Sequence, residues 1–442
     1  MRSLDVYNDN RLVGHLYEGD DLWRFEYESA WARAADSFDL SPGLPRTKLE
    51  HADGGTIRPV QWFFDNLLPE ELLRQAVSRE AGIMGDDAFA LLQYLGAESA
   101  GSLTLLPPGE EPSKASALRD LSSEQLSARI ANLPRLTLTA DAPKRMSLAG
   151  AQHKLLVVYH DGRLYEPEGA TPSTHILKPD HPDAETYPAS VVNEYLTMRL
   201  ARAVGLPVPD VHMLFVPQPV YIVDRFDRIP AEATPPGTRP GLNVGRKHLI
   251  DACQLLNKSR TFKHTGASVQ ALKEIIEATT NKANTRLLLF RWLVFNIAVA
   301  NDDCHLKNLS FFVSSEGVQL APHYDLLATS AYYTRAFADA KATWPDVRMA
   351  VPWDKTHFFS DITAERILQA GRDMGVPDGS ARRILKEVTR RLPIALQNET
   401  AQIRKVHEAA GEPARVYLAA QDRLMRVLEH MIVPEMLGRL AG

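Results

Sequence analysis

The sequence contains little cysteine and has no long uninterrupted hydrophobic run. Its two cysteines, Cys253 and Cys304, lie far apart and match no zinc-binding or redox spacing, which favours a reducing compartment. The longest apolar stretch, residues 287–300, is interrupted by Arg291 and Asn296 and is too short to span a bilayer. The first residues lead into strand-like sequence without a signal-peptide apolar region. We therefore predict a cytoplasmic protein that does not associate with membranes.

The chain as a whole also lacks a large excess of one charge. Its 442 residues include 50 Lys and Arg against 55 Asp and Glu, which gives a net charge of -5. This balance excludes a strong attraction of the whole chain to nucleic acid or to an anionic membrane. Hydrophobic content of 45% and charged content of 24% are ordinary for a globular protein. The length predicts two or three domains.

The order of strand-like and helix-like segments predicts an α+β fold with a β-rich lobe ahead of a larger helical lobe. Short alternating patterns indicate strands near the start, and helices are predicted at 69–76 and 88–94. Pro, Glu, Ser and Lys at 107–117 indicate a linker. The predicted parts are an N-terminal α+β domain at 1–106, a linker at 107–120, the β-rich lobe at 121–245 and the helical lobe at 246–442.

Three later segments carry specific local signals. Ser122 and Gln125 form a capping-box pattern that predicts the start of a short helix. Within the β-rich lobe, residues 189–204 predict a helix that stops at Gly205. Pro and Gly are concentrated in residues 229–243, which we interpret as a flexible insertion.

The most informative stretch is Asn301-Asp302-Asp303-Cys304-His305-Leu306-Lys307-Asn308, a polar loop between two apolar runs. In protein kinases an Asp of the catalytic loop accepts the substrate hydroxyl proton, and an Asn five residues later holds a metal ion. Asp303 and Asn308 have that spacing. The alternative is a solvated loop that ends a helix, since Asp and Asn are common turn formers.

A second aspartate follows this loop at the position expected for a kinase. Residues 311–313 and 318–320 flank a turn and predict a hairpin, which leads to Asp325. Catalytic loop, hairpin and a metal-binding Asp is the order found in kinases. The amide oxygen of Asn308 and the carboxylate of Asp325 are ligands that suit Mg²⁺. Leu326 and Leu327 follow Asp325, so a literal Asp-Phe-Gly motif is missing.

A lysine and a glutamate extend the pattern into the β-rich lobe. Lys178 lies at the end of an apolar strand, where a kinase places the Lys that holds the ATP phosphates. Glu194, on the following helix, is a candidate to pair with it. For each residue, a solvent-exposed charge is the alternative interpretation.

Two further segments are weaker candidates. Residues 147–154, Ser-Leu-Ala-Gly-Ala-Gln-His-Lys, are small and polar and precede a strand, as in loops whose backbone N–H groups approach phosphates. They contain one glycine, so neither a Walker loop nor a kinase glycine-rich loop is present. Asp224 and Phe226 end the β-rich block, where a kinase hinge binds adenine. A surface turn and a charged strand end are the respective alternatives.

Taken together, these motifs resemble HipA, the serine/threonine-kinase toxin of the bacterial HipBA toxin–antitoxin system. The resemblance covers nearly the whole chain and also includes residues 62–70 and 96–101 of the N-terminal domain. It implies a bilobal protein-kinase-like fold with an N-terminal HipA-type domain, and ATP and Mg²⁺ as cofactors. Cys304, His153 and Asp224 depart from the residues familiar in that family, and none of the three changes removes a catalytic atom.

The resemblance implies a role for each candidate residue. Asp303 is the expected catalytic base, His305 and Lys307 complete the catalytic loop, and Asn308 and Asp325 bind Mg²⁺. Ser147 is the expected site of autophosphorylation, which in the family ejects the phosphate-binding loop. The expected ATP-binding residues are Ser147, Ala149, Gly150, Ala151, Gln152, Lys154, Lys178, Glu194, Asp224 and Phe226.

The resemblance also implies partners. They are a HipB-like helix-turn-helix antitoxin, operator DNA bound mainly through that antitoxin, and a translation-related protein substrate such as glutamyl-tRNA synthetase. The sequence leaves a homodimer open. Two other functions also remain open at this point, a small-molecule kinase on the same scaffold and an antitoxin-bound co-repressor without kinase activity. Intact Lys178, Asp303, Asn308 and Asp325 argue against the co-repressor.

Overall fold

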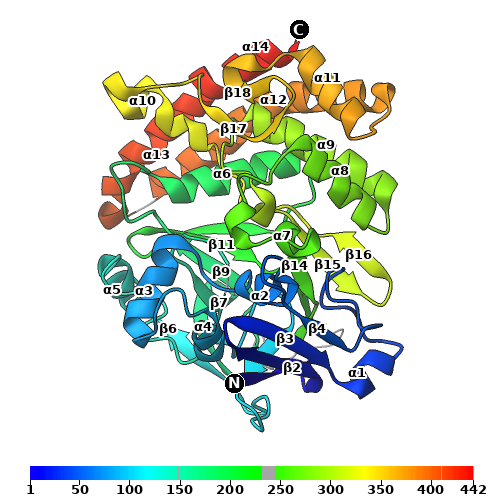
Figure 1. Ribbon diagram of the computed structural model, residues 1–442. Helices are drawn as coiled ribbons and strands as arrows, with labels where there is room; N and C mark the ends of the chain where they lie inside the picture. The colour runs from blue at the N-terminus through cyan, green and yellow to red at the C-terminus, as the bar shows by residue number, and fades with distance from the viewer. Residues whose placement is uncertain (148, 231–243, 410, 442) are drawn as a thin grey trace. The chain divides into compact units, whose positions relative to one another are not determined.

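The computed structural model describes residues 1–147, 149–230, 244–409 and 411–441 (Figure 1). The chain folds into two compact units. Unit 1 comprises Met1–Lys178, Asp224–Phe262 and Ser310–Ala321, and unit 2 comprises Pro179–Val223, Lys263–Leu309 and Pro322–Gly442. The predicted flexible insertion at 229–243 lies almost entirely outside the described residues. The four-part division made from the sequence, with boundaries at 106, 120 and 245, stays a prediction.

Unit 1 begins with a five-stranded antiparallel sheet in the order β4-β3-β2-β1-β5. Buried and partly exposed residues alternate along β3, and Phe25 on that strand packs against Phe64 on α2 with ring centroids 5.7 Å apart. Burial of these aromatic side chains stabilises the unit. The strands are β1 (Arg2–Asn8), β2 (Arg11–Gly19), β3 (Leu22–Tyr27), β4 (Glu50–Ala52) and β5 (Leu103–Leu106).

A second set of antiparallel strands in unit 1 runs in the order β9-β7-β8-β6. Shorter pairs accompany it, β12 with β13 and β14 with β15 and β16. The strands are β6 (Ser116–Leu121), β7 (Leu155–His160), β8 (Arg163–Gly169), β9 (His175–Pro179), β12 (Arg228–Pro230), β13 (Val244–Arg246), β14 (Leu249–Asp251), β15 (Ser310–Ser314) and β16 (Gly317–Leu320). The hairpin predicted around residues 314–317 is therefore confirmed.

The helices of unit 1 are short. They are α1 (Ser29–Arg33), α2 (Pro59–Asp65), α3 (Glu71–Ala81), α4 (Ala88–Leu95), α5 (Ser123–Ala131), α7 (Ala252–Leu255) and the 3-10 turn η1 (Arg260–Phe262). The side chain of Ser122 accepts a hydrogen bond from the backbone of Gln125 at the start of α5, which confirms the capping box.

Unit 2 is mostly helical, and its long helix α12 packs against α6 and α9 (Figure 1). The apolar run at 287–300 forms most of α9, whose buried residues include Phe290, Trp292 and Phe295, as expected for a helix that is apolar on most of its surface. The helices are α6 (Ser190–Ala203), α8 (Val269–Ala278), α9 (Lys282–Ala298), α10 (Arg335–Ala338), α11 (Ala364–Asp373), α12 (Asp378–Ala409), α13 (Arg415–Val427) and α14 (Val433–Ala441).

Two antiparallel hairpins and several single turns complete unit 2. The hairpins are β10 (Val211–Phe215) with β11 (Pro219–Asp224), and β17 (Arg348–Trp353) with β18 (Thr356–Phe358). The turns are η2 (Leu306–Asn308), η3 (Thr329–Tyr333), η4 (Asp339–Lys341), η5 (Phe359–Asp361), η6 (Glu412–Ala414) and the π-helical turn η7 (Leu428–Ile432).

Two predicted segments differ from the structure. The helix expected at 69–76 begins at Glu71, because Pro69 forms a backbone bridge with Gly150, and it continues to Ala81. Gly82 then ends it with a positive φ of 67°, a conformation that suits glycine. The predicted linker residues from Ser116 onward form β6, which pairs with β8.

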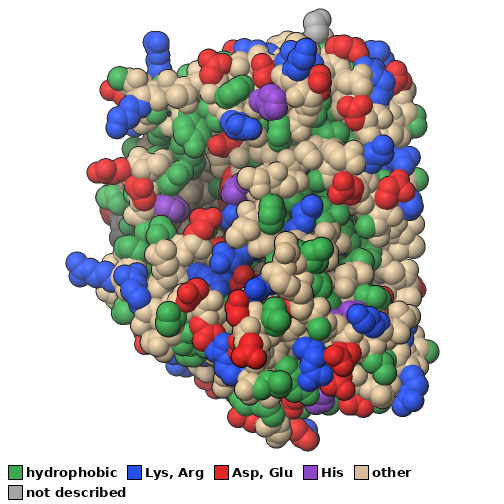
Figure 2. Space-filling model, in the orientation of Figure 1, with side chains coloured by type: hydrophobic (Ala, Val, Ile, Leu, Met, Phe, Trp, Pro, Cys, Tyr) green, Lys and Arg blue, Asp and Glu red, His purple; other side chains and the backbone are tan. Residues whose placement is uncertain are grey.

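The surface carries both signs of charge. On the face drawn in Figure 2, Lys and Arg side chains alternate with Asp and Glu side chains, as expected from the near balance of 50 basic and 55 acidic residues. Among the helices that the structure describes, none is long and apolar enough to cross a membrane.

Candidate functional site

The polar loop at 301–308 is held by its own side chains. The side-chain amide of Asn301 donates to Oδ1 of Asn296 at the end of α9 (2.8 Å), and Oδ1 of Asn301 accepts from the backbone N–H of Asp303 (3.0 Å). The hydroxyl of Thr329 accepts from the N–H of Asp302 (2.8 Å). Asn301 and Asn296 are buried, so these bonds fix the loop backbone in a protected environment.

This arrangement presents Asp303 outward and holds Asn308 inward. The side chain of Asp303 is 58% exposed, whereas Asn308 is buried. Nδ2 of Asn308 donates to the backbone carbonyl of Asp303 (2.8 Å), and Nε2 of His305 lies 4.0 Å from Oδ1 of Asp303. The structure thus brings together Asp303, His305 and Asn308, with Lys307 in the same turn.

The second aspartate is tied to the same loop through its neighbour. The hydroxyl of Tyr324 donates to the backbone carbonyl of Lys307 (2.8 Å). Asp325 follows with φ of 56°, a left-handed conformation that is costly for a non-glycine residue. Beyond it, Oδ1 of Asn193 on α6 accepts from the N–H of Ala328 (2.8 Å), and its Nδ2 donates to the carbonyl of Ala328 (3.2 Å). Asn193 therefore anchors the chain that carries Asp325.

The side-chain oxygens of Asn308 and Asp325 are of the chemical kind that suits a magnesium ion. Nδ2 of Asn308 donates a hydrogen bond to the carbonyl of Asp303. The side-chain oxygen of Asn308 is therefore the atom left to bind a metal ion. An amide oxygen and a carboxylate are hard ligands of the kind that Mg²⁺ takes together with phosphate oxygens.

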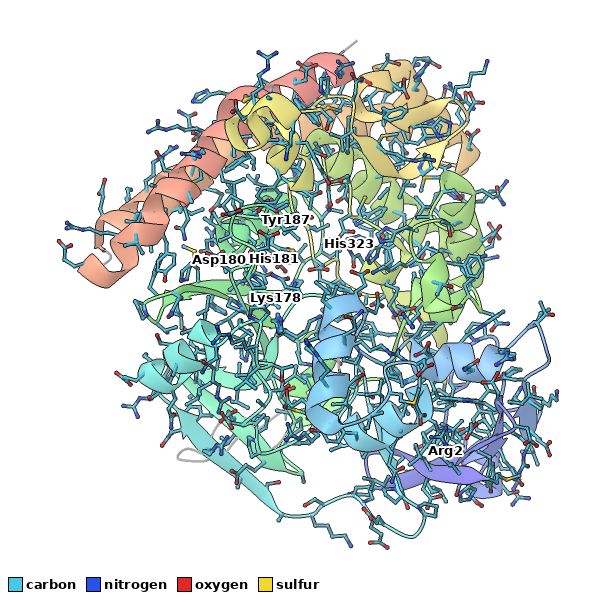
Figure 3. The ribbon with its side chains drawn as sticks, turned by 60° about the vertical axis from the view of Figure 1, so that its left-hand side comes forward. Arg2, Lys178, Asp180, His181, Tyr187 and His323 are labelled. Atoms are coloured by element: carbon cyan, nitrogen blue, oxygen red, sulfur yellow. The ribbon has the colours of Figure 1, made fainter. Side chains whose placement is uncertain are left out.

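The helix that carries Glu194 begins on a partly buried carboxylate. Figure 3 labels Asp180, His181 and Tyr187 in the segment before α6. The carboxylate of Asp180 accepts from the N–H of Val191 (2.8 Å) and the hydroxyl of Ser190 (3.3 Å), and so caps the helix from a distance. Burial raises the pKa of Asp180 to about 6. Glu194, four residues into α6, is buried.

In unit 1, the segment predicted to bind phosphate is docked on the N-terminal residues. Ser147 is buried; its hydroxyl donates to the carbonyl of Leu67 (2.5 Å), and its N–H donates to the carbonyl of Glu98 (2.7 Å). The N–H of Glu70 donates to the carbonyl of Gly150 (3.1 Å). In this conformation the Ser147 hydroxyl is enclosed and already hydrogen-bonded.

The rest of this loop is shaped by Gly150 and Lys154. Gly150 has φ of 107°, a backbone conformation that L side chains rarely adopt, so a substitution here would be strained. Nζ of Lys154 donates to the carbonyl of Ala149 (2.6 Å). Ala151 and Gln152 follow, both partly exposed. Residue 148 lies outside the described residues.

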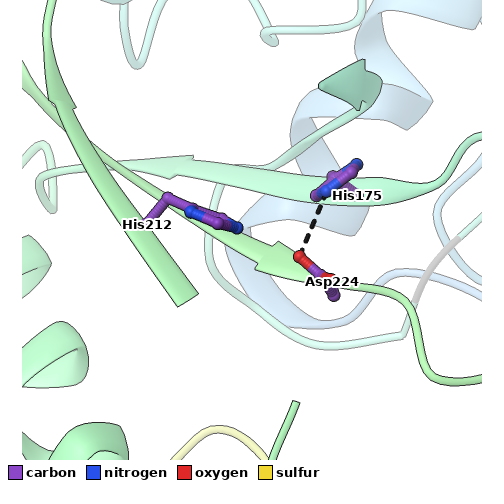
Figure 4. Close-up of side chains that lie close together, drawn as sticks. All are labelled: His175, His212 and Asp224. Carbon is purple, nitrogen blue, oxygen red and sulfur yellow. Dashed lines mark ion pairs between the residues drawn. The ribbon is translucent and has the colours of Figure 1, made fainter. Parts of the chain in front are cut away.

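Strand β9 carries Lys178, which is buried, and His175, whose partner is Asp224. Nδ1 of His175 accepts from the N–H of Tyr159 (3.2 Å), and its Nε2 lies 3.1 Å from Oδ1 of Asp224 (Figure 4). A neutral imidazole that accepts at Nδ1 carries its proton on Nε2, so His175 donates to Asp224. This bond positions the carboxylate of the predicted hinge. The predicted pairing of Lys178 with Glu194 stays a prediction.

The residues around Phe226 form a buried ionic network that the sequence reasoning missed. Phe226 contacts Phe312 edge to face, with ring centroids 5.9 Å apart. Its charged neighbours turn inward: Arg225 and Arg228 both contact Oε1 of Glu98 (3.2 and 2.7 Å) and the carboxylate of Asp227 (2.7 and 2.9 Å). The motif therefore joins the predicted hinge to the N-terminal residues.

Lys144 completes the network at 2.9 Å from Oε2 of Glu98. Burial raises the pKa of the Glu98 carboxyl, but Lys144, Arg228 and Arg225 outweigh this effect and hold the pKa well below its usual range. Glu98 is thus a buried carboxylate that stays charged. The only signal in the sequence was its position within the small-residue segment 96–101.

A mixed α/β fold that carries a polar loop with the kinase spacing of Asp303 and Asn308 is typical of kinase-like enzymes. Two family models match the chain, the HipA-like C-terminal domain over residues 146–396 and the HipA N-terminal domain over residues 4–106. The chain therefore belongs to the HipA family, and the fold class and the family predicted from the sequence are confirmed.

Relatives and a solved structure agree with this assignment. The serine/threonine-protein kinase toxin HipA of Shewanella oneidensis is 30% identical over 75% of this chain and 76% of that protein. Y4mE of Sinorhizobium fredii, a protein named as a kinase, is 35% identical over 75% of this chain and 78% of its own length. HipA in the Shewanella oneidensis complex of HipA, HipB and operator DNA has 25% identity, covers 98% and 99% of the two chains, and gives a TM-score of 0.74.

Proposed function

We propose that this chain transfers the γ-phosphoryl group of ATP to a serine or threonine hydroxyl of a protein, with Asp303 as the catalytic base. The observation that carries the proposal is the loop at 301–308, which exposes the Asp303 side chain while Asn301 and Asn308 hold its backbone. Catalysis of this kind depends on positioning the reacting groups and on stabilising charge. A loop held by its own hydrogen bonds, with one exposed carboxylate, would position the substrate hydroxyl.

The proposed reaction is a single displacement. The hydroxyl oxygen of the substrate forms a bond to the γ-phosphorus, the bond from that phosphorus to the bridging oxygen breaks, and ADP leaves. The carboxylate of Asp303 accepts a hydrogen bond from the hydroxyl, orients it and takes its proton as the new bond forms. His305, 4.0 Å from Asp303, and Lys307 in the same turn complete the proposed loop chemistry.

The remaining candidate residues take the roles expected from the family. Asn308 and Asp325 would hold Mg²⁺, which neutralises charge on the phosphates. Lys178 is proposed to contact ATP phosphates, Glu194 to support it, and Asp224 and Phe226 to lie near adenine. The backbone of Ser147, Ala149, Gly150, Ala151 and Gln152, together with Lys154, is proposed to contact phosphate groups.

The test is the isosteric variant Asp303→Asn. It removes the proton acceptor, so we expect phosphoryl transfer to fall by at least about a hundredfold, with thermal stability nearly unchanged because the side chain is exposed. The measurement is radiolabelled phosphate transfer from ATP to proteins of a bacterial lysate. Asp20→Asn, on an exposed turn with φ of 54°, is the matched control and should keep full activity. Full activity in Asp303→Asn would mean that another group is the base.

We also propose the family's partners for this chain, namely a HipB-like antitoxin, operator DNA mainly through that antitoxin, and a translation-related protein as substrate. The Shewanella oneidensis HipA, found in complex with HipB and operator DNA, supports the first two. Mass spectrometry of the same lysate identifies the phosphorylated protein. ATP consumption without any phosphoprotein would favour a small-molecule kinase, and no ATP consumption would favour a co-repressor.

A further inference from the structure

A histidine outside the predicted site lies against the catalytic loop. His264 precedes α8 and is held by backbone bonds on both sides. The N–H of Leu306 donates to the carbonyl of Lys263 (3.1 Å), and the N–H of Ala267 donates to the carbonyl of His264 (3.0 Å). The first bond joins the segment of His264 directly to the turn that follows His305. The two segments are therefore fixed to each other by main-chain contacts.

The side chains of His264, Asp303 and His305 converge. The two imidazole rings meet edge to face, with centroids 4.7 Å apart. One ligand atom from each of the three residues lies within 4.8 Å of those from the other two, and Nε2 of His305 is 4.0 Å from Oδ1 of Asp303. Two imidazole nitrogens and one carboxylate oxygen therefore share one small volume.

This donor set is chemically selective. Imidazole nitrogen suits zinc and similar transition metals, whereas Mg²⁺ prefers oxygen ligands. Two histidines and one carboxylate with an open position are a known arrangement for Zn²⁺, with bonds of roughly 2.0 to 2.2 Å. Ligand atoms around a tetrahedral ion then lie roughly 3.4 Å apart. The observed spacing requires the side chains to close by about an ångström, which the exposed His264 and Asp303 can do by rotation.

We propose that His264, Asp303 and His305 bind Zn²⁺ and that the bound ion inhibits phosphoryl transfer. Metal binding is a ligand exchange, in which two imidazole nitrogens and one carboxylate oxygen replace water molecules on the ion. The lone pair of Asp303 that accepts the substrate proton is then held by the metal. The inhibitory part of this inference rests on the proposed role of Asp303, whereas zinc binding does not.

One side of the cluster formed by His264, Asp303 and His305 is exposed to solvent. His305 is buried, whereas His264 and Asp303 are exposed, so an ion can enter from solvent and keep a water molecule as its fourth ligand. The site differs from the proposed Mg²⁺ ligands, Asn308 and Asp325, which supply only oxygen. Millimolar Mg²⁺ should therefore not displace Zn²⁺ from the two histidines.

The experiment uses the full-length, metal-free protein and two variants. His264→Ala removes one ligand outside the catalytic machinery, and His160→Ala removes an exposed histidine next to Asp161 as a matched control. Zinc affinity is measured by calorimetry, coordination by the visible absorption of Co²⁺, and inhibition by the rate of phosphoryl transfer at fixed Mg-ATP and fixed free Zn²⁺.

We expect one zinc per chain in the wild type and in His160→Ala, with Co²⁺ absorption typical of four or five ligands. His264→Ala should bind zinc at least about tenfold more weakly. Loss of a residue that only supports a metal ligand already weakens metal binding by about that much, and loss of the ligand itself should weaken it at least as much. At free zinc concentrations that inhibit phosphoryl transfer by the wild type, His264→Ala should retain its phosphoryl-transfer activity.

Equal zinc affinity in the wild type and in His264→Ala would overturn the site. Tight, His264-dependent zinc binding with undiminished phosphoryl transfer would overturn the inhibitory role. A protein with no kinase activity under any condition would refute the proposed function, but calorimetry and the Co²⁺ spectrum would still decide the metal site. Failure of the zinc-site proposal and failure of the proposed kinase function therefore give different experimental results.

Discussion

At the scale of single residues, burial separates the candidate side chains into two kinds. Asp303 is exposed on a braced loop, as a group that acts on an incoming substrate must be. Ser147 is buried, and its hydroxyl donates to the carbonyl of Leu67. A hydroxyl in that state is closed to a phosphoryl donor, so the proposed phosphorylation of Ser147 would require the loop to change conformation first. A phosphate there adds roughly -1.5 to -2 charges, which would oppose return to the buried position.

Ser147→Ala is therefore expected to abolish autophosphorylation and to prolong kinase activity. The change removes one buried hydrogen bond and leaves the carbonyl of Leu67 without this donor, so it should cost about 1 to 3 kcal/mol of stability. Phosphosite mass spectrometry after incubation with Mg-ATP measures the first effect, and a time course of substrate phosphorylation measures the second. Ser123→Ala, at an exposed position on α5, is the control. Phosphate at another residue with equal stoichiometry in the variant would contradict the role of Ser147.

Residue identity and spacing indicated most of the candidate site residues. The spacing of Asp303 and Asn308 and the later Asp325 were visible in the sequence, because catalytic groups carried by one short loop keep a fixed order. His264 was invisible, because it lies 39 positions before Asp303 and nothing in its neighbours indicates a ligand. Only the folded chain brings the two together.

At the scale of elements, the buried network around Glu98 joins four segments of unit 1. Glu98 contacts Lys144, Arg225 and Arg228, and the hydroxyl and N–H of Ser173 donate to its Oε1 (2.8 and 3.2 Å). The N–H of Gly101 also donates to Asp227 (2.9 Å). Charges this deeply buried are tolerated because each has partners of opposite sign.

Glu98→Gln keeps the shape of the side chain but leaves three buried cations with one carboxylate, Asp227. We expect a loss of about 3 to 5 kcal/mol in the free energy of unfolding, measured by urea denaturation. Glu408→Gln, at an exposed position on α12, should change stability by less than about 0.5 kcal/mol. Equal stability of Glu98→Gln and the wild type would show that the network is energetically neutral.

At the scale of the whole molecule, buried neutral histidines make stability depend on pH. His323 is buried against Trp292, with ring centroids 6.3 Å apart, and burial lowers its pKa to about 3. In the unfolded chain the pKa is near 6.5. Between these values the unfolded chain binds the extra proton, so stability is full above pH 6.5 and falls as the pH drops below it.

His323→Phe should weaken this dependence because it removes the titrating group and keeps a ring against Trp292. Relative to pH 7, the wild type should lose about 2 kcal/mol more than the variant by pH 5. Denaturation at a series of pH values measures the difference. His160→Ala, which removes an exposed histidine, should follow the wild type. Parallel curves for His323→Phe and the wild type would contradict the assignment.

The sequence by itself determined the family, the kinase-like fold class and the order of the polar loop at 301–308, the hairpin and Asp325, because these depend on local spacing and hydrophobic pattern. It also located α6 and the capped start of α5. Tertiary structure determined which side chains are buried and which groups the buried side chains contact. It enclosed Ser147, turned Arg225, Asp227 and Arg228 into an internal network, and set His264 beside Asp303. These outcomes depend on contacts between residues far apart in the chain, and spacing along the sequence does not encode them.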